Sequence, residues 1–437
     1  MSETKETSLW LVPIITLGFA STQLTWSLFN IAVPVILDET FGISLGLIGF
    51  IMTWDNIIAF FVQPTIGSYS DRMITRWGRR FPFIIPGIIF GSILFFLLSQ
   101  SKNQMLYLFL INIVIFNLFM ALYRSPSVSL VPDLIPSHKR SIANGLANLT
   151  GGIAAALSLF IAGGLLKAGH TTEAFGFVSI GMIVCLVLLL IFVREPKYEV
   201  IESDEPSEGA ISRLKSEMNR IVHDDNKSML FMLLALLSWF MAWNAIEAFY
   251  SVFVNKEFLP NLDAEKAAGE AGQVLFVFPV VFVIFTIVGG ILGTKIGRRL
   301  TMKIGLLLML FSIILGAFVY ENSFLGLEMN WKTSYRLIFV FAGIGWGLVN
   351  VNSIVVVWEH SSDNGIGTGI YYAFSSAAAI LGPTLVGILM DITTVRALFP
   401  FSIVFLTISF FLLLNVKTGE QGERETILGD ALSEMID

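Results

Sequence analysis

Three residues that could bind a proton or a charged group lie inside long apolar stretches of the chain: Asp55, Arg124 and Glu247. A charge inside a membrane span is costly, so residues of this kind usually serve a function. An acid in such a span can take up a proton on one side of a membrane and release it on the other. Asp55 and Glu247 are therefore candidates for ion coupling, or alternatively structural partners or residues of a water-filled cavity. Arg124 could bind a substrate or stabilise a helix bundle.

Polar and aromatic side chains recur on single faces of the apolar stretches. One such face carries Gln23, Trp26 and Asn30 at helical spacing. Amide and charged groups can bind the hydroxyls of a sugar, and aromatic rings can stack on its ring faces. Any single Trp could instead lie at a membrane interface or face lipid. The candidate substrate-binding residues are Gln23, Trp26, Asn30, Asn56, Asn117, Arg124, Trp243, Asn244, Trp346, Asn350, Tyr371 and Tyr372.

The apolar stretches follow one another along the whole chain. Of 437 residues, 55% are hydrophobic and 14% are charged, against about 25% charged in a soluble domain. Each stretch has about the 20 residues that a membrane helix requires. We therefore predict an all-α membrane protein with 12 transmembrane helices, at 9–37, 45–69, 81–99, 105–131, 141–166, 174–193, 229–254, 273–294, 300–320, 333–358, 365–390 and 395–416.

Basic hinges follow the second and the eighth of these predicted helices. The first hinge contains QPTIGSYSDR at 63–72 and GRRFPF at 78–83, and the second contains GRR at 297–299. Arg79 and Arg298 lie about half a chain length apart, which indicates two similar six-helix halves. We predict an N-terminal half at 1–193, a central connection at 194–228, a C-terminal half at 229–416 and a tail at 417–437.

The distribution of Lys and Arg predicts the orientation of the helices. Basic residues gather in both hinges, in the central connection and in the other connections on the same side. By the positive-inside rule this side is cytoplasmic, and so are both termini. Ile211, Leu214, Met218 and Ile221 recur at helical spacing in the central connection. They predict a short amphipathic helix lying on the cytoplasmic face.

Several classes of function are excluded by the sequence. The net charge of −6 offers no basic footprint for nucleic acid. Cys185 is the single cysteine and the four histidines are scattered, so no metal site is expected. The sequence holds no nucleotide-binding loop, zinc motif or nucleophile elbow of an enzyme. We therefore expect no cofactor, and transport that is driven by an ion gradient and not by ATP.

The hinge motifs resemble those of major facilitator superfamily transporters, whose loop between helices 2 and 3 has a glycine, an Asp-Arg pair and a Gly-Arg-Arg end. The form found here is similar to the sucrose-transporter-related branch of the glycoside–pentoside–hexuronide cation symporters. A second match is RSP at 124–126, followed by PDL at 132–134, Arg140 and Asn144. The resemblance covers almost the whole chain and implies ion-coupled sugar uptake by alternating access.

The resemblance also implies a cytoplasmic gate, whose charge pairs would hold the inner side closed and yield when the halves rock. The gate residues are expected to be Gly67, Asp71, Arg72, Gly78, Arg79, Arg80, Asp133, Arg140, Gly297, Arg298 and Arg299.

The chain departs from the family pattern at the coupling positions. Gln63 stands where melibiose-permease-like members have a cation-binding Asp, and Asn117 stands where plant sucrose transporters have an acid. In the second hinge, Thr294 stands where the motif usually has Asp. Sodium coupling is therefore disfavoured, and we expect H+ to be the coupling ion, with Asp55 as a substitute site.

These patterns together predict a proton-coupled sugar symporter in a bacterial-type inner membrane. We expect a disaccharide such as sucrose or maltose as the substrate, contact with the lipid bilayer, no nucleic acid and a monomeric protein. An efflux antiporter for drugs or metabolites is the alternative with the same fold, and a bulkier, more apolar cavity would favour it. A membrane sensor that binds a ligand without transporting it, and signals through the central connection, is a second alternative.

Overall fold

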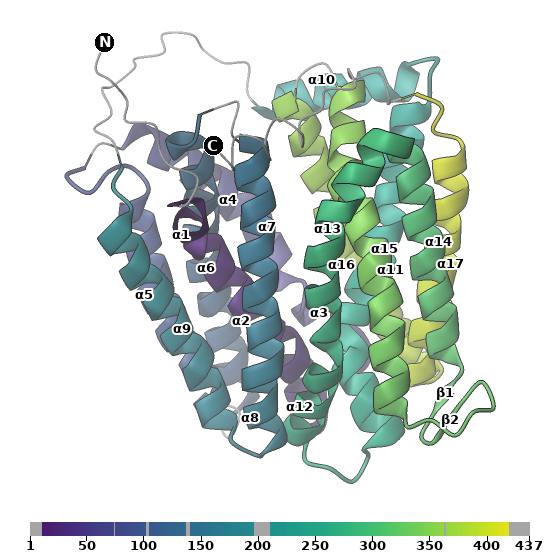
Figure 1. The fold of residues 1–437 in the computed structure, drawn as a ribbon. Helices are drawn as coiled ribbons and strands as arrows, with labels where there is room; N and C mark the ends of the chain where they lie inside the picture. The colour runs from purple at the N-terminus through teal and green to yellow at the C-terminus, as the bar shows by residue number, and fades with distance from the viewer. Residues whose placement is uncertain are drawn as a thin grey trace, which may run out of the picture. The chain divides into compact units, whose positions relative to one another are not determined.

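The computed structural model describes residues 11–73, 75–101, 105–136, 140–195, 210–361 and 364–418. In these residues, 12 helical spans are long and apolar enough to cross a membrane (Figure 1). The predicted all-α fold with 12 transmembrane helices is thus confirmed. The chain forms two compact units, Met1–Ile201 with Ala248–Pro279 and Glu202–Glu247 with Val280–Asp437. The residue bounds expected for the two halves from the sequence repeat stay a prediction.

The first unit is built around α2, which packs against α6, α7 and α9. Its elements are α1 (Val12–Ile15), α2 (Leu17–Val35), the π-helix η2 (Ile36–Thr40), α3 (Leu45–Ile51), α4 (Trp54–Arg72), α5 (Phe81–Ser101), α6 (Leu106–Leu134), α7 (Arg140–Leu157), the π-helix η4 (Ser158–Ala162), α8 (Gly163–Lys167), α9 (Thr171–Phe192) and α12 (Ala264–Leu275).

The second unit is built around α14, which packs against α15 and α17. A short helix, α10, lies in the central connection where the sequence predicts an amphipathic one. The elements are α10 (Ala210–His223), α11 (Ser228–Phe258), α13 (Val277–Ile296), α14 (Arg298–Ala317), β1 (Val319–Tyr320), β2 (Ser323–Phe324), α15 (Trp331–His360), α16 (Asn364–Ile392), the 3-10 helix η5 (Val395–Ala397) and α17 (Leu398–Leu414). The end of α11 from Ala248 and the first residues of α13 up to Pro279 belong to the first unit.

Glycines let the helices of the second unit approach closely. A Cβ built on Gly345 would lie 2.5 Å from the carbonyl oxygen of Gly305, and one built on Gly289 would lie 2.9 Å from that of Gly347. Backbones in contact at such positions gain van der Waals attraction along the helices, which drives association where lipid removes the hydrophobic effect. These contacts fix α15 against both α13 and α14.

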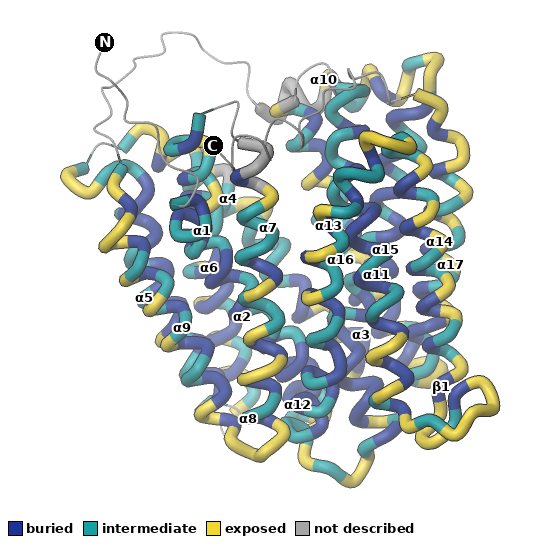
Figure 2. Tube along the Cα trace, viewed as in Figure 1, coloured by how far each residue is buried: buried dark blue, intermediate teal, exposed yellow. Residues whose placement is uncertain are grey.

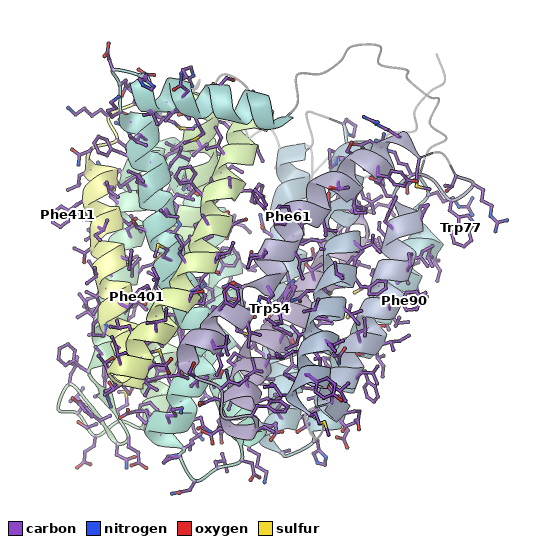
Figure 3. The ribbon with its side chains drawn as sticks, turned by 180° about the vertical axis from the view of Figure 1, so that it is seen from behind. Trp54, Phe61, Trp77, Phe90, Phe401 and Phe411 are labelled. Atoms are coloured by element: carbon purple, nitrogen blue, oxygen red, sulfur yellow. The ribbon has the colours of Figure 1, made fainter. Side chains whose placement is uncertain are left out.

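Large apolar side chains face outward along the spans, as lipid-facing surfaces require. Phe90 on α5 is 49% exposed and Phe411 on α17 is 60% exposed. Figure 3 shows each of them directed away from the helices of its own unit. Figure 2 shows that buried and exposed positions also alternate along the other spans.

Several spans differ by a few residues from the bounds predicted from sequence, and the second and the eighth also differ in form. The second is interrupted at Met52 and Thr53, between α3 and α4, so that Asp55 lies in the first turn of α4 and not in mid-helix. The eighth begins at Ala264 and not at 273. Its first turns, which the sequence predicts to be a connection, carry ion pairs: Lys266 lies 2.6 Å from Asp263, which precedes α12, and Glu270 lies 3.4 Å from Lys167.

Candidate functional site

Three charged residues of the first hinge and Asp133, at the end of α6, form one network in the first unit. Arg79 Nη2 lies 2.6 Å from Asp133 Oδ1, and Arg80 Nε lies 2.7 Å from Asp133 Oδ2. Arg80 Nη2 also lies 2.5 Å from Asp71 Oδ1. The end of α4, the start of α5 and the end of α6 are therefore joined by charge-assisted hydrogen bonds.

Arg80 is the buried centre of this network. Its side chain is 5% exposed, against 10% for Asp133 and 55% for Asp71. Burial alone would lower the pKa of the Arg80 guanidinium, but the hydrogen bond and charge of Asp133, and the charge of Asp71, raise it above its ordinary value. Arg80 therefore stays protonated at every physiological pH, and Asp133 supplies most of the charge that compensates it.

Glu195 completes the first hinge, although no motif in the sequence indicates it. Its carboxylate accepts hydrogen bonds from the backbone N–H groups of Arg79, Arg80 and Phe81, at 2.8, 2.9 and 3.0 Å. Those donors begin α5, where backbone N–H groups lack intrahelical partners and the helix dipole favours an anion. Gly78 has a φ of +96°, and a Cβ on it would lie 2.4 Å from Glu195 Cδ. A glycine is therefore required there.

The second hinge repeats parts of this arrangement in the second unit. Gly297 also has a φ of +96°, and it precedes α14 as Gly78 precedes α5. Arg298 forms an ion pair with Glu359, at the end of α15, and Arg299 Nη1 donates to the carbonyl oxygen of Val416 at 3.1 Å. Sequence reasoning missed Glu359, which could have been noticed as the one acid at the end of span 10 in a connection without Lys or Arg.

The remaining gate candidates contribute less to the described geometry. Gly67 lies against α6, since a Cβ on it would be 3.2 Å from Ser125 Oγ. Arg72 is exposed at the end of α4. The side chain of Arg140 lies outside the described residues. The gate role of the whole set stays a prediction.

Trp26 lies in an aromatic cluster of the first unit, and Asn117 follows one member of that cluster, Phe116, along α6. The Trp26 ring packs edge-on against Phe29 and Phe116, with centroids 5.2 and 5.7 Å apart. Asn117 is 2% exposed. Trp26 Nε1 and Asn117 Oδ1 are both buried with no hydrogen-bond partner among the described residues. A buried donor and a buried acceptor of this kind are costly unless something pairs with them.

The other candidates of the first unit are placed on different helices. Gln23 lies against Gly151 of α7, where a Cβ would meet its Cγ at 3.1 Å. Asn56 donates to Asp55 Oδ1 at 2.8 Å, at the start of α4. Asn30 and Arg124 are both partly buried.

Three aromatic candidates meet in the second unit. The rings of Trp243 and Trp346 have centroids 5.3 Å apart, and Phe240 links Trp346 at 5.2 Å to Tyr371 at 6.2 Å. Tyr371 also hydrogen-bonds Ser353 at 3.0 Å. This box combines residues of α11, α15 and α16. Phe240 was missed, because a Phe in an apolar helix gives no signal of its own.

The remaining candidates of the second unit differ in their surroundings. Asn244 donates to the carbonyl oxygen of Phe240 in its own helix at 2.7 Å, so its amide is partly engaged. Tyr372 is 59% exposed, beside the more buried Tyr371. Glu247 and Asn350 are partly buried.

A further polar contact of the first unit was not foreseen at all. Asp38, in the π-helix η2, lies 2.9 Å from Lys256. Helices α8 and α12 run side by side (Figure 1), and a Cβ on Gly269 would lie only 2.2 Å from the backbone nitrogen of Lys167. Gln273 donates to the carbonyl oxygen of Phe160 in the π-helix η4. π-Helices leave carbonyls without regular partners and often mark functional sites.

Comparison with known families decides the class of this protein. The model of the Major Facilitator Superfamily matches residues 15–259 and 258–430. The chain belongs to this family. It is therefore a transporter of many membrane passes and not an enzyme.

Individual relatives in the family are distant. A general alpha-glucoside permease of Schizosaccharomyces pombe is 24% identical over 243 residues, which is 49% of this chain and 42% of the relative. The sucrose transport protein SUC3 of Arabidopsis thaliana is 28% identical over 148 residues, which is 29% of this chain and 25% of the relative. In these comparisons the chain spans less than half the length of the curated relatives.

Solved structures show the same fold at lower identity. The nucleoside transporter NupG has a TM-score of 0.68 and 13% identity, covering 93% of this chain and 99% of that one. A bacterial homolog of the human lysosomal transporter Spinster, in an inward-facing and occupied conformation, has a TM-score of 0.68 and 16% identity, covering 94% and 97%. At this identity the likeness concerns the fold alone.

Proposed function

We propose that this transporter is a proton-coupled sugar symporter that works by alternating access, with a disaccharide such as sucrose or maltose as its substrate. The observation that supports this best is that two buried polar atoms of the first unit, Trp26 Nε1 and Asn117 Oδ1, have no hydrogen-bond partner among the described residues. A sugar hydroxyl both donates and accepts hydrogen bonds, so it can pair with an indole N–H and with an amide oxygen. The permease and sucrose-transporter relatives favour the same substrate class.

The aromatic box of the second unit offers, by itself, a second surface for a sugar. Trp243, Trp346 and Tyr371 present ring faces on three helices, and such faces bind the apolar C–H faces of a pyranose by dispersion. Because both clusters lie on spans, a substrate bound there is withdrawn from water. Each hydroxyl must then be paired, which favours a ligand with many hydroxyls over an apolar drug.

Proton coupling is assigned to Asp55, with Glu247 as the second candidate. Asp55 accepts a hydrogen bond from Asn56 at the start of α4, next to the interruption of the span. An acid inside a membrane span is a candidate for binding a coupling proton, because its charged form is costly there. The Asp71–Arg80–Asp133–Arg79 network serves in this mechanism as a gate on the cytoplasmic side, with both termini on that side of an inner membrane.

The test is uptake of labelled sucrose and of labelled maltose into proteoliposomes, under an imposed pH gradient and separately under a sodium gradient. Accumulation driven by protons is the expected result, and Asp55→Asn should abolish it while leaving sugar binding and exchange. Accumulation driven by sodium alone would refute the proton assignment. If the folded protein moves neither sugar inward but exports solutes against a proton gradient, the antiporter is the better description.

A further inference from the structure

The connection between α14 and α15 is a folded hairpin whose strands are only two residues long. Val319 pairs with Phe324, and Tyr320 pairs with Ser323. Val319 is 0% exposed and Phe324 is 5% exposed, because the inner face of the hairpin packs on α15. Figure 1 shows β1 and β2 directly beyond the end of α14.

The outer surface of this hairpin is apolar, although it lies outside the spans. Phe318, Tyr320, Leu325 and Leu327 are 50%, 55%, 57% and 61% exposed. Figure 2 shows the hairpin with exposed residues along its outer side. Four large exposed apolar residues in one short connection are unfavourable in water and indicate contact with an apolar partner.

The turn after β2 carries one of these leucines at a conformational cost. Phe324 N–H donates to the Leu327 carbonyl at 3.0 Å, and Leu327 N–H donates back to the Phe324 carbonyl at 2.9 Å. The two residues between them, Leu325 and Gly326, have φ of 51° and 81°. Two-residue turns with positive φ at both positions favour Asn-Gly or Asp-Gly. Leu325 is the one non-glycine residue with positive φ in the described ranges.

The apolar surface continues the lipid-facing stripe of α14. Exposed residues follow this helix at spacings of three and four, and the stripe consists of Leu300, Ile304, Leu307, Phe311, Ile314 and Phe318. Val319 pairs with Phe324 in an antiparallel ladder. The residue before Val319, Phe318, and the residue after Phe324, Leu325, therefore lie opposite each other at the end of the ladder nearest to α14. The other end of the ladder is the polar turn of Glu321 and Asn322.

The base of the hairpin has the residues that favour a membrane interface. The Arg396 guanidinium carbon lies 4.7 Å from the centre of the Tyr320 ring, and Arg396 donates to the Val319 carbonyl at 3.4 Å. Tyr and Arg are stable at the level of lipid headgroups, where an apolar body and a polar end are both satisfied.

We propose that Phe318, Tyr320, Leu325 and Leu327, here named the hairpin anchor, insert into the interface of the bilayer and hold the end of α14 at a fixed depth. The partner is the lipid surface on the side of the membrane opposite to α10, since three spans separate the two elements. This proposal does not depend on which solute is transported.

Spin labels measure the depth of the hairpin anchor directly. The native thiol is removed by Cys185→Ser, and single labels are placed at Leu325→Cys and Leu327→Cys in phosphatidylcholine vesicles. Asn261→Cys, exposed in the polar connection between α11 and α12 on the same side, is the water control. Phe311→Cys, 48% exposed in the stripe of α14, is the lipid control. We expect the ratio of collisions with oxygen to collisions with Ni-EDDA to be severalfold higher at both hairpin labels than at 261.

Equal ratios at 325, 327 and 261 would overturn the proposal. A second variant separates anchoring from folding, because Leu325→Asn suits the turn and should unfold at the same or a higher temperature in detergent. In the vesicle it should move the label at 327 toward water, with a severalfold lower ratio. A label at 327 that stays at lipid depth would show that Leu325 is not part of an anchor.

Discussion

The most direct test of the first hinge is to remove the charge of Asp133 while keeping its shape. Asp133→Asn leaves Arg80 with Asp71 as its remaining carboxylate, and Asp71 is 55% exposed while the Arg80 side chain is 5% exposed. A buried charge that loses its buried partner costs about 3–5 kcal/mol. Removing an exposed partner costs about 0–1 kcal/mol. We therefore expect Asp71→Asn to lose several kcal/mol less stability than Asp133→Asn.

The chain provides its own reporter for this measurement. Cys185 is the single cysteine and is only partly exposed on α9, so a thiol-reactive dye reports its exposure during unfolding by titration with denaturing detergent. At 1.4 kcal/mol per factor of ten, the expected loss for Asp133→Asn shifts the unfolding equilibrium by about a hundredfold to a few thousandfold.

A rescue variant distinguishes an uncompensated charge from lost packing. Adding Arg80→Met to Asp133→Asn removes the buried charge, and pairs replaced by apolar groups are often no less stable than the ion pair. The double variant should therefore be more stable than Asp133→Asn alone. Equal losses for Asp71→Asn and Asp133→Asn, or a double variant whose losses simply add, would refute the account of Arg80 as a buried charge held by Asp133.

Four further outcomes are expected. Gly78→Ala should destabilise more than Gly42→Ala in the same dye assay, because both have positive φ but only the Cβ at 78 would meet Glu195, while nothing lies within 4 Å of one at 42. Gly269→Leu should separate α12 from α8 and reduce uptake, whereas Gly164→Ala, whose Cβ would meet Gln273 at an ordinary 3.4 Å, should not. Glu195→Gln should lower the free energy of unfolding by about 1–2 kcal/mol, since an amide oxygen replaces an anion at the start of α5; an unchanged value would argue against the capping role. Because the pKa of Arg80 is raised, its stabilisation is lost only as pH rises through that pKa, so the loss caused by Arg80→Met should be constant from about pH 6 to pH 9.

Sequence patterns predict most of this fold because lipid imposes strong rules on them. A span must be apolar and about 20 residues long, so the apolar pattern predicted all 12. The rules weaken where charges are neutralised locally, which is why the start of the eighth span at Ala264 was missed. They also do not predict the turn at Met52 and Thr53, because neither Gly nor Pro stands at this position.

Sequence patterns name candidate site residues where these residues recur on one helix or in one motif. They miss residues whose contact partners are far away along the chain. The candidate list from the sequence included Trp243, Trp346 and Tyr371, whose rings the structure places in one cluster through Phe240. The hinge motif likewise named both arginines of the network. Glu195, Glu359 and Asp38 were missed because an acid at the end of a span is ordinary in sequence. Only the tertiary structure shows what these acids contact: Glu195 accepts from backbone N–H groups, and Glu359 and Asp38 pair with basic side chains.

The cap on α5 has a consequence for the order of assembly. The helix begins at Phe81, but the carboxylate that pairs with its first N–H groups belongs to Glu195, which follows the sixth span. During synthesis the first hinge therefore exists for four spans as an incomplete structure, with three backbone donors that only water can satisfy. The hinge can be completed only after the sixth span has been synthesised. Glu195, which accepts these hydrogen bonds, follows Phe81 by more than a hundred positions.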